Sequence, residues 1–215
     1  MPSVVKPVLV VIAGPNGSGK TEIAKILRSN YDWTEGLTEV NPDNIAQQEF
    51  GNWNDPEAVL KGARRADEIR EECLAKRQGL IFETVLSIPE KVDYIQRTKD
   101  AGYFIRMVYV ATESPEINMV RVAWRADQGG HTVPVEKIRS RYQRSLQQAI
   151  AAARIVDRAY FVDNSRDVEN PTDEISPFPV FRTVDGVVAR IYVKEEEMPK
   201  WTKEIYEALQ RDLKG

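Results

Sequence analysis

Hydrophobic residues are grouped along the chain into short runs, and the stretches between these runs have the spacing of amphipathic helices. Four apolar runs and one shorter mixed segment predict five strands, over residues 8–13, 38–43, 79–84, 103–111 and 159–164. Helical spacing follows residue 21 and recurs over 55–78, 88–101, 114–128 and 134–158. Strands that alternate with helices predict an α/β fold whose parallel sheet is wrapped by helices on both sides.

The C-terminal part of the chain breaks this alternation. Residues 179–193, PVFRTVDGVVARIYV, predict a β-hairpin around Asp185-Gly186, because an Asp-Gly pair between apolar runs is typical of tight hairpins. A final helix is expected from about Pro199. We therefore expect a single domain over residues 1–215, with a helical subregion over 113–158 and a C-terminal hairpin and helix over 178–213.

Composition excludes several classes of protein. The net charge of -3 argues against bulk electrostatic binding to nucleic acid, although it leaves room for a local basic surface. One cysteine, Cys73, and one histidine argue against a disulfide framework and a structural zinc site. The first apolar run ends at Gly14, too early for a membrane span, and it has no signal-peptide cleavage pattern. These features predict a cytoplasmic protein.

Residues 14–21, GPNGSGKT, join the first strand to the following helix and match the pattern G-x-x-x-x-G-K-[ST]. Glycines let backbone N–H groups converge on phosphate oxygens, and the helix N-terminus adds the positive end of its dipole. Lys20 is expected to reach the β- and γ-phosphates of ATP, and the Thr21 hydroxyl to bind Mg²⁺. The predicted nucleotide-binding residues are Gly14, Pro15, Asn16, Gly17, Ser18, Gly19, Lys20 and Thr21.

Carboxylates follow the ends of the next strands, where ligands collect in parallel sheets. Asp43 is a candidate general base for a substrate hydroxyl, although NPDN is also good chemistry for an Asx turn or a helix cap. Glu83 is a candidate for the Mg²⁺ shell or a substrate hydroxyl, and the alternative is a solvated strand end. Thr84 is a candidate hydrogen-bonding group for a polar substrate. Asp163 is the corresponding acid of the fifth strand.

Residues 119–158 are unusually basic, with eight Lys and Arg against three acids. Gly129 and Gly130 separate two helices, so this region is a candidate mobile lid that brings arginines onto the phosphates of ATP. The alternative is a solvated helix face, which we expect for Arg144, Arg154 and Arg158. The arginines nearest the glycines are the candidates for phosphate contact, namely Arg125, Arg139 and Arg141. His131 is expected to fix the loop rather than to catalyse.

Several of these segments together resemble the zeta toxin family of P-loop kinases. The matching segments are GPNGSGKT, VNPDNIA, IFETVLS, the long stretch from AGYFIRMVYV through QGGHTVPVEKIRSRY, and FVDNS, in the family's order over about residues 7–165. The chain lacks the glycine that plasmid-borne members often have between the acid and the threonine of FETVLS. In this respect it resembles the shorter chromosomal branch.

The resemblance implies a kinase that phosphorylates a hydroxyl of a nucleotide-sugar, chiefly UDP-N-acetylglucosamine, and a possible antitoxin partner. It assigns the base to Asp43, the phosphate-binding lysine to Lys20 and the substrate side to Glu83 and Thr84. It assigns the lid arginines to Arg125 and one arginine of IRSRY, for which we take Arg141 as catalytic. A nucleotide, an antibiotic or a nucleic-acid end stay open as acceptors, as does an ATP-binding switch that transfers nothing.

Overall fold

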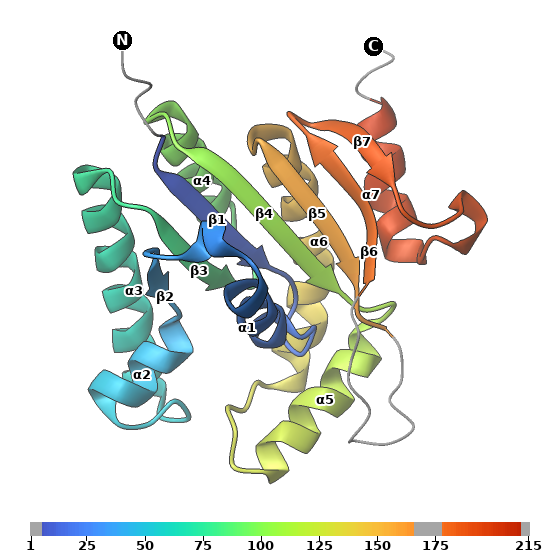
Figure 1. Cartoon of the computed structure of the whole chain (residues 1–215). Helices are drawn as coiled ribbons and strands as arrows, with labels where there is room; N and C mark the ends of the chain where they lie inside the picture. Colours follow the sequence, from blue (N-terminus) through green and yellow to red (C-terminus); the bar gives the residue numbers. More distant parts are fainter. Residues whose placement is uncertain (1–5, 166–177, 212–215) are drawn as a thin grey trace.

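The computed structural model describes residues 6–165 and 178–211. Its centre is a seven-stranded sheet with the strand order β2-β3-β1-β4-β5-β6-β7 (Figure 1). The strands are β1 (Val8–Ala13), β2 (Thr38–Val40), β3 (Leu80–Thr84), β4 (Phe104–Ala111), β5 (Arg158–Asp163), β6 (Phe178–Val184) and β7 (Val187–Ile191).

The first five strands are parallel, as the sequence predicts. β1 pairs with both β3 and β4, β2 pairs with β3, and β4 pairs with β5. Their carboxyl ends therefore meet at one edge of the sheet, where the phosphate loop follows β1. The predicted hairpin extends this same sheet, because β6 pairs antiparallel with β5 and β7 with β6. Asp185 and Gly186 both have positive φ, 48° and 78°, as the tight turn requires.

Seven α-helices connect and flank the strands in the described part of the chain. They are α1 (Lys20–Asn30), α2 (Pro42–Phe50), α3 (Pro56–Lys76), α4 (Pro89–Asp100), α5 (Pro115–Asp127), α6 (Val135–Ile155) and α7 (Lys200–Arg211). Two short 3₁₀ turns, at Asp32–Thr34 and Glu195–Glu197, complete the list. None of the described helices is both long and apolar enough to cross a membrane.

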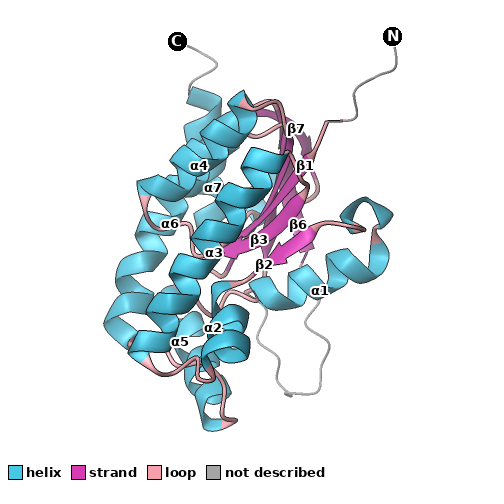
Figure 2. Cartoon of the chain, turned by 90° about the vertical axis from the view of Figure 1, so that its left-hand side faces the viewer, coloured by secondary structure: helices cyan, strands magenta, loops and turns pink. Residues whose placement is uncertain are grey.

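The helices cover the two faces of the sheet unequally. Figure 2 shows α3, α4, α6 and α7 together on one side and α1 alone on the other. The larger core lies on the first side and contains the fully buried Phe82, Tyr109, Phe161 and Phe181, with Trp201 from α7. The smaller core lies under α1, around Val10, Ile12, Ile23, Val108 and Val110. The expected wrapping on both sides is therefore only partial, because no described helix covers this second face of β6 and β7.

One helix is absent from the sequence-based prediction. The segment expected to be a strand over 38–43 is a strand only as far as Val40, and α2 begins at Pro42. Asn41 accounts for the change, because its side chain accepts hydrogen bonds from the backbone N–H groups of Asp43 and Asn44. A capping asparagine followed by a first-turn proline is a helix start signal. The helix start was not predicted, because the residues before Asn41 have a strand pattern and the whole segment was therefore assigned to a strand.

Candidate active site

The phosphate loop is shaped by glycines at three positions. Gly14, Gly17 and Gly19 all have positive φ, of 146°, 80° and 98°. A Cβ atom would lie 1.9 Å from the Val110 oxygen at Gly14, 2.6 Å from the Asn118 oxygen at Gly17 and 2.4 Å from Asn164 Nδ2 at Gly19. Side chains there would both strain the backbone and collide with neighbouring elements. The third glycine, Gly17, is thus as necessary to this loop as the two that the motif specifies.

Lys20 begins α1 and turns back over the loop. Its Nζ donates a hydrogen bond to the Pro15 carbonyl at 2.9 Å. Burial lowers the pKa of Lys20 to about 8, although Glu83 and Asp43 act to raise it. The N-cap residue Gly19 offers no side-chain cap to the first N–H groups of α1. This leaves a half-buried ammonium and an uncapped helix N-terminus facing the same loop, which suits a phosphate group.

Thr21 and Glu83 lie side by side next to this loop. The Thr21 hydroxyl donates a hydrogen bond to Glu83 Oε2 at 3.1 Å. Glu83 lies in β3, the strand that pairs with β1. Burial raises the pKa of Glu83, against the opposing effects of Lys20, Thr21 and Asn41. The described residues contain no group of three or more His, Cys, Asp or Glu side chains placed to hold a metal ion by themselves. A hydroxyl and one carboxylate nevertheless fit Mg²⁺, which usually takes few protein ligands and completes its shell with phosphates and water.

Asp43 is exposed in the first turn of α2, and Asn41 performs the helix capping that the sequence allowed for Asp43. The carboxylate interacts electrostatically with Lys20 and also with Arg141. Its carboxylate therefore lies within electrostatic reach of the phosphate loop and of α6. This is a suitable position for a group that accepts a proton from a bound hydroxyl.

Thr84 has a local structural role in addition to its predicted one. Its Oγ1 accepts a hydrogen bond from the Leu86 N–H at 3.0 Å. Leu86 is buried and has a φ of 52°, so this contact supports a strained turn just after β3. The Thr84 hydroxyl keeps its own proton for a second partner. Substrate contact by Thr84 stays a prediction.

The arginines of α5 and α6 differ in position. Arg125 and Arg141 both lower the pKa of Lys20, so both lie near the phosphate loop. Arg141 is half-buried, and burial lowers its own pKa, followed by the effect of Arg144. Arg139 is 64% exposed and lies 3.5 Å from Glu116 of α5. Residues two apart lie on different sides of a helix, so α6 directs Arg139 away from Arg141. Phosphate contact by Arg139 stays a prediction.

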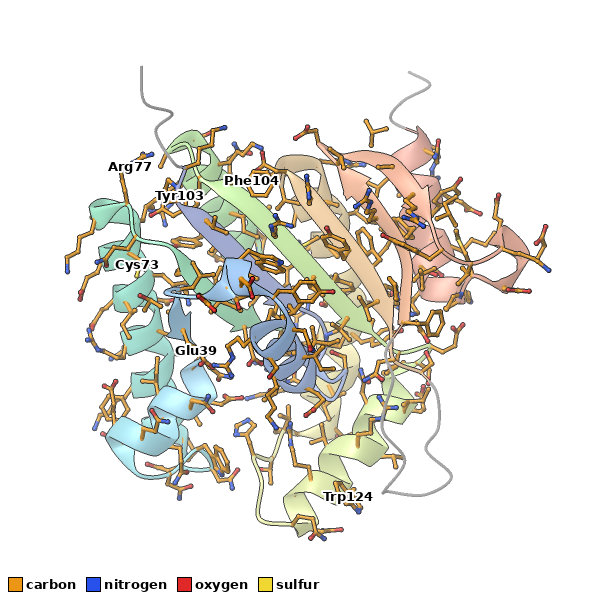
Figure 3. All side chains as sticks on the ribbon, viewed as in Figure 1. Glu39, Cys73, Arg77, Tyr103, Phe104 and Trp124 are labelled. Atoms are coloured by element: carbon orange, nitrogen blue, oxygen red, sulfur yellow. The ribbon has the colours of Figure 1, made fainter. Side chains whose placement is uncertain are left out.

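The expected solvated face is confirmed for two of the three other arginines. Arg144 and Arg154 are exposed on α6. Arg158 is not on a helix, because α6 ends at Ile155 and Arg158 is the first residue of β5. The outer surface of α5 is apolar as well as charged, with Trp124 56% exposed and pointing away from the sheet (Figure 3).

The loop between α5 and α6 is hydrogen-bonded to the loop between α2 and α3. The carbonyl of Trp53 lies 2.8 Å from His131 Nδ1, and Asn54 Oδ1 accepts from the Thr132 N–H at 2.9 Å. Arg125 Nη2 donates to the His131 carbonyl at 3.1 Å. His131 therefore fixes the loop, as expected. The role of Asn54 was not predicted, since an asparagine in the polar segment NWND gives no sign of a partner 78 residues away.

A second unpredicted residue is Asn164, which follows β5. Its Nδ2 donates to the Ser18 carbonyl at 2.9 Å, and its own carbonyl accepts from Arg121 Nη1 at 2.8 Å. Asp163 before it is 3% exposed and accepts hydrogen bonds from Trp201 Nε1 at 2.8 Å and Ser165 Oγ at 2.7 Å. Asp163 is thus a buried structural carboxylate. Asp163 ends a strand whose carboxyl end lies beside the phosphate loop. This position was the one feature of the sequence that could have indicated a role for the neighbouring Asn164.

The site as a whole combines three cationic side chains with two carboxylates. Arg125, Arg141, Asp43 and Glu83 all interact electrostatically with Lys20 of the phosphate loop. Cations around a glycine-rich loop can bind a triphosphate, and a carboxylate opposite can receive the proton of an attacking hydroxyl. The geometry is therefore suited to phosphoryl transfer.

Comparison with solved structures finds the same fold in several proteins. A chain of the AvrRxo1-ORF1:AvrRxo1-ORF2 complex matches with a TM-score of 0.60 at 18% identity, over 96% of this chain and 76% of that chain. A chain of the PezAT chromosomal toxin–antitoxin system of Streptococcus pneumoniae matches with 0.54 at 16% identity, over 99% and 88%. A chain of the Pnkp1/Rnl/Hen1 RNA repair complex matches with 0.54 at 16% identity, over 83% and 50%. These likenesses confirm the expected P-loop kinase-like fold.

Sequence comparison gives the family. An uncharacterized protein of Haemophilus influenzae is 25% identical over 133 residues, which are 62% of this chain and 91% of that protein. The profile of the zeta toxin family matches residues 1–178, which include the phosphate loop, both candidate carboxylates, the lid and Asn164. The chain therefore belongs to the zeta toxin family.

Proposed function

We propose that this protein is an ATP-dependent kinase that phosphorylates a hydroxyl of a nucleotide-sugar such as UDP-N-acetylglucosamine. Membership of the zeta toxin family and the P-loop kinase-like fold support a kinase-type function and ATP binding. The observation that carries the proposal is the position of Asp43, whose carboxylate lies within electrostatic reach of both Lys20 and Arg141. A protein that only binds ATP needs no carboxylate in this position.

In this proposal the residues of the site divide the work of the reaction among them. The phosphate loop and Lys20 bind the β- and γ-phosphates, and Arg125 and Arg141 stabilise the charge that develops during transfer. Asp43 accepts the proton of the acceptor hydroxyl as the oxygen attacks the γ-phosphorus. Thr21, with Glu83 beside it, would hold Mg²⁺, which when bound neutralises phosphate charge. Glu83 and Thr84 orient the acceptor.

We infer the chemical class of the acceptor from the family to which the chain belongs, and not from a pocket with a bound ligand. The acceptor would enter between α2, which carries Asp43, and the end of β3, which carries Thr84. Lys20, Arg125 and Arg141 gather positive charge beside this entrance, which suits an acceptor that itself carries phosphates, as a nucleotide-sugar does. We also include an antitoxin among its partners and the cytoplasm as its location. The description of PezAT as a toxin–antitoxin system supports the first for the family.

A direct test is to incubate the protein with ATP, Mg²⁺ and a metabolite extract, and to identify by mass spectrometry which compound gains a phosphate. UDP-N-acetylglucosamine, free nucleotides and a 5′-hydroxyl oligonucleotide should also be assayed singly. We expect the nucleotide-sugar to be phosphorylated, and Asp43→Asn to abolish the product. Phosphorylation of only a nucleotide or a nucleic-acid end would replace the proposed acceptor. If none of these acceptors gains a phosphate, the kinase assignment is overturned.

A further inference from the structure

The face of the sheet that carries α1 is only partly covered. Figure 1 shows α1 in front of the lower part of the sheet, and the upper part of β4 and most of β5, β6 and β7 without a helix in front of them. The terminal helix α7 does not supply this cover, because its buried residues Trp201, Ile205 and Leu209 belong to the core on the opposite face. Within the described residues, this open face is therefore left for solvent or for a partner.

Four arginines lie on this open face, one on each strand. Arg106 of β4 pairs with Arg158 of β5, Tyr160 of β5 pairs with Arg182 of β6, and Arg182 pairs with Arg190 of β7. Residues that pair directly point to the same side of a sheet. The side is that of α1, because Tyr160 packs against the small core beneath α1. We refer to Arg106, Arg158, Arg182 and Arg190 as the arginine face.

Aromatic rings lie between these arginines. The guanidinium of Arg106 lies 4.7 Å from the centre of the Trp33 ring and 5.1 Å from that of Phe104. Arg158 lies 5.7 Å from the same Phe104 ring, which is labelled at the start of β4 in Figure 3. Arg190 lies 5.1 Å from Tyr192. Such contacts hold the guanidinium groups in place without neutralising them.

The four guanidinium groups of the arginine face are without ion-pair partners in the described part of the chain. None of the four arginines forms an ion pair with another described residue, and no acidic residue of β4–β7 points to this side. Burial lowers the pKa of Arg106, and the charge of Arg158 opposite it adds to this effect. The Arg182 Nε is buried and has no hydrogen-bond partner among the described residues. Like charges on directly paired strands destabilise a sheet, so an anionic ligand would relieve a cost that the protein carries alone.

This surface is separate from the phosphate loop. Arg106 lies on the strand beside Val10, which precedes Gly14 by four residues of extended chain, or about 13 Å. The arginines farther along, Arg182 and Arg190, lie on strands that do not border the phosphate loop. The acceptor of the proposed kinase reaction would enter at the carboxyl edge of the sheet, so the arginine face serves some other ligand.

We propose that the arginine face binds single-stranded nucleic acid. Guanidinium groups bind phosphates through paired hydrogen bonds, and rings at strand spacing provide surfaces on which bases stack. Four arginines with interleaved Tyr160, Phe104 and Tyr192 supply both, in a chain whose overall charge is negative. An acidic protein segment would use the charges but not the rings, and is therefore the alternative that the experiment must exclude.

The test is fluorescence anisotropy with labelled 12-nucleotide RNA and DNA at several salt concentrations. The variant Arg158→Gln, Arg182→Gln, Arg190→Gln removes three charges and leaves Arg106 on its aromatic partners. We expect it to weaken oligonucleotide binding by tenfold or more, and to reduce the steepness of the salt dependence by about 0.7 per lost phosphate contact. Comparing RNA with DNA shows which of the two the surface prefers.

The matched control is Arg64→Gln, Lys76→Gln, Lys203→Gln, which makes the same change in net charge on exposed helical positions of the opposite side. It should bind oligonucleotides as the unaltered protein does. Equal loss in both variants would mean that only net charge matters, and would overturn the proposal. Unlabelled polyglutamate that competes as well as RNA would also overturn it, in favour of an acidic protein partner. None of these results depends on kinase activity, so they leave the proposed function untouched.

Discussion

Lys20 is the residue at which burial and function oppose each other most directly. Its pKa of about 8 in the folded protein lies below the ordinary value of 10.5. The folded state therefore binds fewer protons than the unfolded state between these two values, and stability should rise as pH rises through this window. Below pH 8 the half-buried ammonium lowers the stability of the folded state, and a bound phosphate would remove this cost.

We predict that Lys20→Met abolishes ATP turnover and raises the melting temperature at pH 7. The side chain is still partly exposed, so we expect a gain on the order of 1 kcal/mol, or about 2–4 °C for a chain of this size. The gain should shrink as the pH approaches 10.5. Scanning calorimetry at pH 7 and 10 with an ATPase assay checks both effects. Normal turnover, or a lower melting temperature at pH 7, would contradict this account of the residue.

At the scale of elements, α5 and α6 should act through particular positions rather than through total charge. Arg125→Ala and Arg141→Ala should each lower the turnover number by about tenfold to a thousandfold, the usual cost of one lost charge-stabilising donor. Arg154→Ala should be nearly silent, because 13 residues of helix place it about 20 Å from Arg141. Steady-state kinetics on the three variants distinguishes these position-specific effects from an effect of total charge. Three equal effects would mean that the basic stretch is only a solvated surface.

The contact between the α2–α3 loop and the α5–α6 loop leads to a second prediction at the scale of elements. Asn54→Ala removes the acceptor for the Thr132 N–H and loosens the loop whose His131 carbonyl binds Arg125. We expect turnover to fall by about tenfold, with a melting temperature close to normal because Asn54 is exposed. Glu57→Ala, at an exposed position in the first turn of α3 and ion-paired with Lys61, is the control. If the two variants lose activity equally, the bridge to the lid is not what matters.

At the scale of the whole molecule, the C-terminal helix is connected to the phosphate loop. Trp201 of α7 donates to the buried Asp163, and the next residue, Asn164, binds the Ser18 carbonyl. Trp201→Phe keeps most of the packing but removes the donor, so we expect a loss of about 1–3 kcal/mol in stability and weaker ATP binding. Denaturant unfolding and ATP titration measure the two. Thr202→Val, at the neighbouring buried position, is the control, and should weaken ATP binding less.

Much of this molecule was predictable because local patterns agree with the fold. The strand, loop and helix from Val8 to Asn30 and the hairpin turn at Asp185 follow from residue type alone. The helix α2 was missed because Asn41 both ends a strand and caps a helix. The roles of Asn54, Asn164 and Trp201 were missed because each depends on a partner far away in the sequence. The arginine face depends on strand order, which periodicity does not determine.

The central claim, that Asp43 is the base of a phosphoryl transfer, is tested most directly by phosphate transfer in Asp43→Asn. The substitution keeps the size of the side chain, and Asn41 still caps α2, so ATP affinity and melting temperature should stay near normal. Asn41→Ala is the control and should lower stability by about 1 kcal/mol. The account predicts a turnover number reduced about a hundredfold or more in Asp43→Asn. Full transfer activity in this variant would contradict it.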